Sequence, residues 1–193
     1  MTKWLSHRMV ERGIIKEEEQ ELYQFGIRNG MILLLNVVTA LVIGLLTEQL
    51  AVVAVFTLSF MVLRSYTGGY HSDSRIFCYL GSNLVLLVPV YTQAVFYKTS
   101  LAWPLAVLLV SAGIIFLLSP MHSKNRKLDK EEQKHFGRKA RLIAALELAV
   151  LGILWHAGQI PYAYAVYTGI CITALFMLVG KAQLWIQSHT ENG

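Results

Sequence analysis

Hydrophobic residues along this chain gather into long runs separated by short polar segments. Six runs can be drawn: Met31–Leu46, Leu50–Leu63, Tyr79–Tyr97, Leu101–Ser119, Leu142–Ala157 and Ile160–Gly180. A helix needs about 20 residues, within a range of roughly 17 to 25, to cross the hydrocarbon of a bilayer. The third, fourth and sixth runs meet this length. The other three need flanking residues, such as 27–30 or 65–67, or are tilted half-spans or re-entrant pieces shielded by protein.

This pattern predicts an all-α, polytopic integral membrane protein with about six hydrophobic segments. The alternative is four full spans plus re-entrant or half spans. Composition agrees, because 55% of the 193 residues are hydrophobic and 15% are charged, against about 25% charged in soluble domains. The mean hydropathy is +0.49. The length suits a single membrane domain over 1–193. The first residues lack a signal peptide's apolar core and cleavage site, so we expect insertion through the first hydrophobic segment.

Positive charge is distributed unevenly between alternate loops. Of the 17 Lys and Arg residues, five precede the first run, two lie between the second and third, eight lie between the fourth and fifth, and one follows the sixth. The remaining three loops contain only Lys98. Cytoplasmic loops are enriched in Lys and Arg. Six spans therefore predict that both termini, the insert over 64–78 and the basic loop over 120–141 lie in the cytoplasm of a bacterial cell-membrane protein.

The net charge of +5 and the pI near 9.2 do not indicate nucleic acid here. The basic residues lie where topology requires them, and no aromatic residues alternate with them as a stacking surface would require. Membrane lipids with anionic headgroups, or an acidic peptide, are the expected partners.

The first 26 residues predict interfacial amphipathic helices. Trp4, Leu5 and Met9 lie near one helical face, Gly13 can end that helix, and the acidic residues 17–19 suit the positive end of a second one. Such a region is expected to lie on the lipid headgroups.

The polar insert over 64–78 contains the candidate chemistry. His71 and Cys78 pair a general base with a sulfur nucleophile, and a neighbouring imidazole can convert a thiol into the reactive thiolate. Seven residues of unbroken helix would separate them by about 10 Å in rise, so direct contact requires the backbone to turn. Gly68 and Gly69 provide conformational freedom, and a helix carrying Cys78 can begin near residues 72–74.

Other polar residues have both a functional and a structural interpretation. Arg64 could bind an acidic group or stabilise an oxyanion, or it could be an interfacial residue ending the second span. Asp73 could orient His71 or cap a helix. Glu147, inside the fifth run, could face the bundle interior or contact a substrate. Cys171 lies in an apolar run and is expected to serve packing. The histidines have no metal-site spacing, so we expect no metal.

The string Arg-x-x-x-Gly-Gly-x-His-x(6)-Cys resembles the signature of the accessory gene regulator B (AgrB) family, bacterial membrane cysteine endopeptidases that process quorum-sensing propeptides. Arg64, Gly68, Gly69, His71 and Cys78 match it. The length, the hydrophobic layout and the basic loop with Asn-Arg-Lys at 125–127 are also similar to the family pattern.

The resemblance implies a two-step reaction without a cofactor. Cys78 would cleave a small amphipathic propeptide with His71 as general base and hold the peptide as a thioester. A cysteine or serine of the peptide would then close a thiolactone or lactone ring, in a site that excludes water. The resemblance also implies a homodimer. Two alternatives remain open: cleavage followed by hydrolysis, and a non-enzymatic peptide exporter or peptide-binding scaffold in which His71 and Cys78 are incidental.

Overall fold

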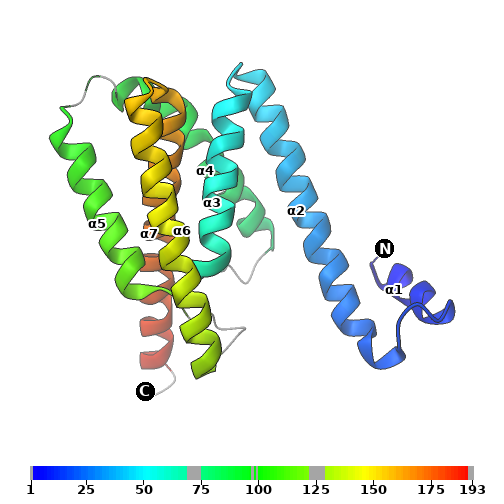
Figure 1. Cartoon of the computed structure of the whole chain (residues 1–193). Helices are drawn as coiled ribbons and strands as arrows, with labels where there is room; N and C mark the ends of the chain where they lie inside the picture. Colours follow the sequence, from blue (N-terminus) through cyan, green and yellow to red (C-terminus); the bar gives the residue numbers. More distant parts are fainter. Residues whose placement is uncertain (1, 69–74, 97, 99, 122–128, 191–193) are drawn as a thin grey trace. The chain divides into compact units, whose positions relative to one another are not determined.

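The computed structural model describes residues 2–68, 75–96, 98, 100–121 and 129–190, and the regular structure in these segments is entirely helical (Figure 1). The helices are α1 (Thr2–Glu11), η1 (Glu17–Glu19), α2 (Gln20–Leu46), α3 (Leu50–Thr67), α4 (Arg75–Phe96), α5 (Ala102–Leu118), α6 (Lys130–His156) and α7 (Ile160–Thr190). The predicted all-α fold class is confirmed.

The chain divides into two compact units, residues 1–39 and 40–193. In the first unit, α1 ends at Glu11, and Gly13, the residue predicted to end it, follows two positions later with a φ of +65°. The Glu19 carboxylate then accepts a hydrogen bond from the backbone N–H of Lys16 at 3.2 Å, at the start of η1. Acidic side chains stabilise the first turn of a helix, because the backbone N–H groups there have no partner within the helix. The placement of this region on a membrane surface stays a prediction.

Among the residues that the structure describes, four helices are long and apolar enough to cross a membrane: the segments Glu17–Leu46, Leu50–Thr67, Tyr79–Phe96 and Ile160–Ile186. The apolar helix α5 has 17 residues. Helix α6 has 27 residues but carries charges through its first twelve positions, so its apolar part is only the predicted run from Leu142. The number of crossings therefore stays a prediction.

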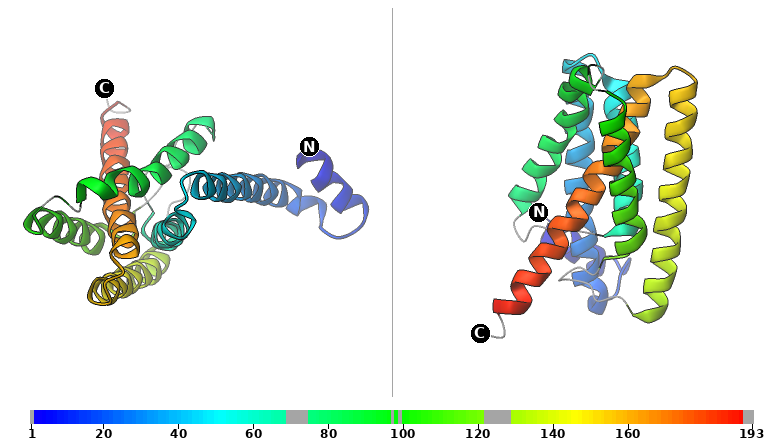
Figure 2. Two further views of the ribbon diagram at one scale, coloured as in Figure 1. Left: turned by 90° about the horizontal axis from the view of Figure 1, so that it is seen from above. Right: turned by 90° about the vertical axis from the view of Figure 1, so that its left-hand side faces the viewer.

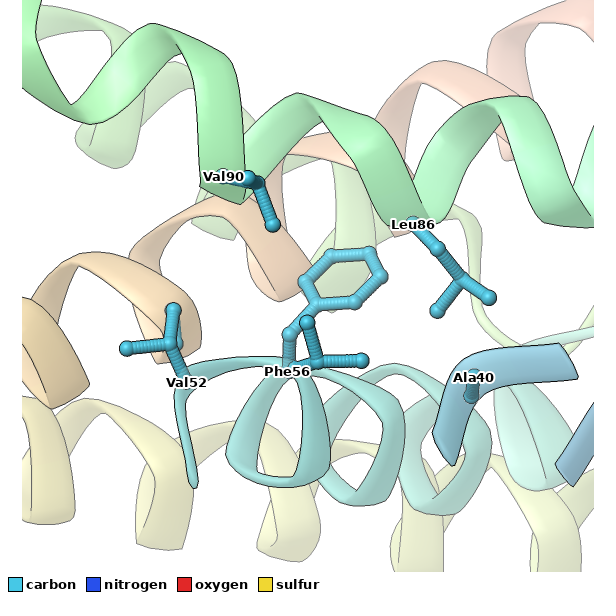
Figure 3. Close-up of a cluster of buried hydrophobic side chains, with 7 residues drawn as sticks. Ala40, Val52, Phe56, Leu86 and Val90 are labelled. Carbon is cyan, nitrogen blue, oxygen red and sulfur yellow. The ribbon is translucent and has the colours of Figure 1, made fainter. Parts of the chain in front are cut away.

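Helix α7 is the centre of the second unit and packs against α3, α4, α5 and α6. Seen from above in Figure 2, it lies in the middle of these helices. Two buried clusters surround it. The first is Ala40, Val52, Val53, Phe56, Leu86, Val90 and Ala165. The second is Leu63, Ile115, Ala144, Val166, Ile170, Ala174 and Met177. Figure 3 shows the Phe56 ring between Val90 and Leu86 of α4.

The helices of the second unit alternate in direction, so the C-terminal ends of α3, α5 and α7 meet the N-terminal ends of α4 and α6 (Figures 1 and 2). We call this the basic end, because several basic residues lie towards it: Arg64, Arg75, Lys181 and those in the first twelve residues of α6. Lys98 follows the far end of α4. This clustering agrees with the charge asymmetry on which the predicted topology rests.

Candidate functional site

The predicted insert over 64–78 begins in one helix and ends in another. Arg64 lies in the last turn of α3, and Cys78 lies in the first turn of α4, which begins at Arg75, just after the predicted range. Gly69, His71 and Asp73 lie outside the described residues, and so does the side chain of Cys78. Direct contact between His71 and Cys78 therefore stays a prediction.

Gly68 ends α3 in a conformation that requires glycine. Its φ is +71° and its N–H donates to the Arg64 carbonyl at 3.3 Å. A Cβ at this position would lie 2.6 Å from the Met121 carbonyl oxygen. The same segment is joined by a hydrogen bond of 2.8 Å from the Met121 N–H to the carbonyl of the buried Thr67. Gly68 thus has a backbone conformation that favours glycine, and the end of α3 lies against the segment that follows α5.

Arg64 packs against aromatic rings. Its guanidinium carbon lies 4.7 Å from the ring centre of Phe176 on α7 and 5.8 Å from that of Phe60 on its own helix. A guanidinium within about 6 Å of an aromatic face is attracted by the ring quadrupole, more strongly where water is excluded. Arg64 is half-buried, so these rings orient its side chain at the basic end. No pattern in the sequence indicates Phe176 as its neighbour.

The first turns of α6 lie against the end of α3. The Phe136 ring centre is 6.2 Å from that of Tyr66, and Lys139 Nζ is 5.7 Å from the same Tyr66 ring. Arg141 Nε donates a hydrogen bond of 3.0 Å to the Phe116 carbonyl in the last turn of α5. Cationic side chains stabilise unpaired carbonyls at a helix C-terminus. Part of the predicted basic loop therefore folds as helix and borders the end of α3 from which the insert leaves.

The N-terminus of α6 is capped by its own acidic residues. Glu132 N–H donates to Asp129 Oδ1 at 2.7 Å, and Asp129 N–H donates to Glu132 Oε2 at 3.3 Å. This reciprocal arrangement is a capping box. The Asp-x-x-Glu spacing in the sequence could have located this helix start, which hydropathy alone placed twelve residues later.

Glu147 has a partner that sequence analysis did not name. Ser59 Oγ on α3 donates to Glu147 Oε2 on α6 at 2.9 Å. Gly169 of α7 lies beside this bond, because a Cβ there would be 2.6 Å from Ser59 Oγ. Of its two interpretations, the structure thus supports the bundle interior, where a hydrogen bond lowers the cost of a buried carboxyl group. The signal in the sequence was one polar residue in each of two apolar runs, the Ser59 hydroxyl in one and the Glu147 carboxyl in the other, and these did not define a pair.

Cys171 lies on α7, half-buried and within hydrogen-bonding reach of Ser111 and Tyr167. Its surroundings belong to the helix interior, in agreement with the packing role predicted for it.

Comparison with known proteins gives one family. The model of accessory gene regulator B matches residues 1–178. The "Putative AgrB-like protein" of Clostridium perfringens (strain SM101 / Type A) is 24% identical over 149 residues, which cover 74% of this chain and 69% of the relative. The "Putative AgrB-like protein 2" of Clostridium perfringens (strain 13 / Type A) is 24% identical over 131 residues, 65% of this chain and 61% of the relative. No solved structure matches.

Proposed function

The chain belongs to the accessory gene regulator B family, and from this we propose that it is a membrane-embedded cysteine endopeptidase acting in quorum sensing. Its substrate is a small amphipathic propeptide, which it cleaves on the cytoplasmic side of the bacterial cell membrane. The peptide is held as a thioester and then passed to cyclisation. The observation that supports this most directly is the spacing of Arg64, Gly68, Gly69, His71 and Cys78 inside a family match that covers residues 1–178.

The proposed reaction needs only side chains. His71 takes the proton of the Cys78 thiol, and the thiolate attacks a peptide carbonyl carbon. The C–N bond breaks, the proton passes to the leaving amine, and the peptide remains as a thioester on sulfur. A thiol or hydroxyl of the peptide then attacks that carbonyl, forming the ring and returning the thiol of Cys78. Exchange of one thioester for another is nearly balanced, so a site that excludes water favours the ring over hydrolysis.

The position of Cys78 supports the nucleophilic role. The first turn of α4 contains Cys78, and the unpaired N–H groups of a helix N-terminus favour negative charge nearby. Reactive cysteines are found at such positions. The C-terminal end of α3 also supports the proposal. The Thr67–Met121 hydrogen bond and the turn at Gly68 fix the point at which the chain leaves α3 towards His71 and Cys78.

Two further assignments follow from the same proposal. The basic end faces the cytoplasm, because positive residues are retained there, so a newly made propeptide meets the insert on that side. Arg64, held over Phe176, either pairs with an acidic group of the propeptide or stabilises the oxyanion. The active species is proposed to be a homodimer.

The test is co-expression with small amphipathic peptides encoded in the same genome, followed by detection of the cleaved peptide. Cys78→Ala should abolish cleavage, and His71→Ala should remove nearly all of it. Cys171→Ala is the matched control, because this second cysteine is half-buried in α7, within hydrogen-bonding reach of Ser111 and Tyr167. It should cleave normally.

Each result separates the enzyme from the alternatives. Cleavage by Cys78→Ala at the wild-type rate would overturn the proposed nucleophile and favour a non-enzymatic scaffold. A wild-type product that is linear would support cleavage with hydrolysis and contradict ring closure.

A further inference from the structure

A cavity of about 240 Å³ lies between the helices of the second unit, at the end opposite the basic end. It is bounded by the last turns of α4 and α6 and the first turns of α5 and α7. The described part of the insert belongs to the other end of the bundle, so the proposed propeptide chemistry does not account for this cavity. Its lining is almost entirely apolar.

Four aromatic rings form one wall. The Phe96 ring centre lies 4.5 Å from that of Tyr164, 5.4 Å from that of Tyr167 and 6.3 Å from that of Trp155. The Tyr164 hydroxyl shares a hydrogen bond of 2.5 Å with Thr92. The hydroxyl of Tyr164 is therefore paired with Thr92, and its ring provides apolar surface to the cavity. Aromatic rings that pack against one another hold each other in place, so this side of the cavity has its shape before a ligand binds.

Gly152 leaves the opposite wall open. It lines the cavity from α6, and a Cβ placed on it would meet no atom within 4 Å. The space beside this glycine is therefore free volume. Apolar cavities of about 150 Å³ in other proteins stay dry and bind benzene, so a larger apolar cavity is a site for hydrocarbon and a poor site for water.

The surroundings of the cavity indicate a membrane interface. Tyr91 on α4 and Trp103 on α5 are 68% and 72% exposed near the same end. Exposed Trp and Tyr residues gather where hydrocarbon meets headgroups. The exposed His156 also lines the cavity, at the end of α6. A hydrocarbon interior with a polar group at its rim suits an amphiphile.

We propose that this cavity binds one acyl chain of a membrane phospholipid, with the lipid headgroup at His156. The chain lies against the ring wall of Phe96, Tyr164 and Tyr167 and fills the space beside Gly152. The bilayer is the source of the occupant, because it surrounds the helices on which the cavity opens.

The experiment uses the full chain in vesicles of phosphatidylethanolamine and phosphatidylglycerol that contain phosphatidylglycerol with a diazirine on one acyl chain. After illumination, mass spectrometry locates the labelled residues. The wild type should be labelled on the cavity lining, at Tyr164 or Tyr167, and on Leu117, which is 82% exposed and marks ordinary lipid contact. Gly152→Leu should lose the cavity label and keep the Leu117 label.

Gly113→Leu is the matched control, since it adds the same side chain to α5 at another glycine with no atom within 4 Å of its Cβ. It should keep both labels. If Gly152→Leu does not fold, Leu108→Phe narrows the cavity from α5 and should give the same selective loss. The proposal is overturned if the lining is unlabelled in the wild type, or if filling the cavity leaves its label unchanged.

Discussion

The Ser59 hydroxyl on α3 donates a hydrogen bond of 2.9 Å to Glu147 Oε2 on α6. The contact is possible because Gly169 on α7 has no side chain, which lets α7 approach Ser59 closely. Three helices therefore meet at one polar pair beside one glycine. Small residues and interhelical hydrogen bonds are the usual means of helix association in a membrane, where burial of apolar surface gives no driving force between helices.

Removing the Ser59 hydroxyl should destabilise the bundle. Ser59→Ala is expected to lower the free energy of unfolding by about 0.6 kcal/mol, the average for such bonds in membranes, and by no more than about 1.7 kcal/mol, their maximum. Thr57→Val is the control, because the Thr57 hydroxyl donates only to Val53 within its own helix, and its effect should be smaller. Unfolding of each variant by titration with a denaturing detergent measures both changes in free energy. If Ser59→Ala and Glu147→Ala were additive in the double variant, the pair would not be coupled.

A methyl group at Gly169 should disrupt the same contact. Gly169→Ala places a Cβ 2.6 Å from Ser59 Oγ, and such overpacking costs about 1 to 3 kcal/mol. Gly152→Ala on α6 meets no atom within 4 Å, and there replacement of a helical glycine should stabilise by about 0.5 to 1 kcal/mol. Thermal unfolding of the two variants compares them. Equal effects would show that α3 and α7 do not approach each other as described.

Gly68→Ala should reduce both stability and propeptide cleavage. The φ of +71° strains any other residue, and the new Cβ would lie 2.6 Å from the Met121 carbonyl oxygen. Strain of this kind costs about 1 to 3 kcal/mol. Gly13→Ala shares the positive φ but meets no atom within 4 Å, so it should cost less and leave cleavage unchanged. Normal cleavage by Gly68→Ala would show that this turn does not contribute to propeptide cleavage.

Arg64 and Phe176 should be energetically coupled. A cycle of Arg64→Met, Phe176→Leu and the double variant is expected to give a coupling of about 0.5 to 2 kcal/mol in unfolding free energy. Arg28→Met with Phe25→Leu is the matched control, because the Arg28 guanidinium carbon lies 5.8 Å from the Phe25 ring centre and Phe25 is exposed. Its coupling should be near the lower limit. A zero value for Arg64 and Phe176 would show that the ring does not hold the guanidinium.

Hydropathy predicted most of the helices of this chain but not where α6 begins. The apolar run from Leu142 marks only the second half of α6, because its first half is amphipathic and stabilised by the Asp129 capping box. A window that averages hydropathy does not detect such a segment. The positive-charge count, in contrast, anticipated that basic residues of distant segments gather at one end.

The candidate site was predictable as a motif and not as a set of contacts. The spacing from Arg64 to Cys78 is local in the sequence, so it could be read directly. The contact of Arg64 with Phe176 and that of Glu147 with Ser59 join residues 112 and 88 positions apart. Only the packing of α3, α6 and α7 brings these residues together, and single polar residues in apolar runs do not specify their partners.

The proposed reaction requires that Cys78 becomes covalently attached to the propeptide. Its most direct test is mass spectrometry of the protein purified after co-expression with a propeptide that lacks its own cyclising cysteine or serine. We expect a peptide adduct on Cys78 that is absent from Cys78→Ala and present in Cys171→Ala. A cleaved peptide without any adduct on Cys78, or an adduct on Cys171, would contradict it.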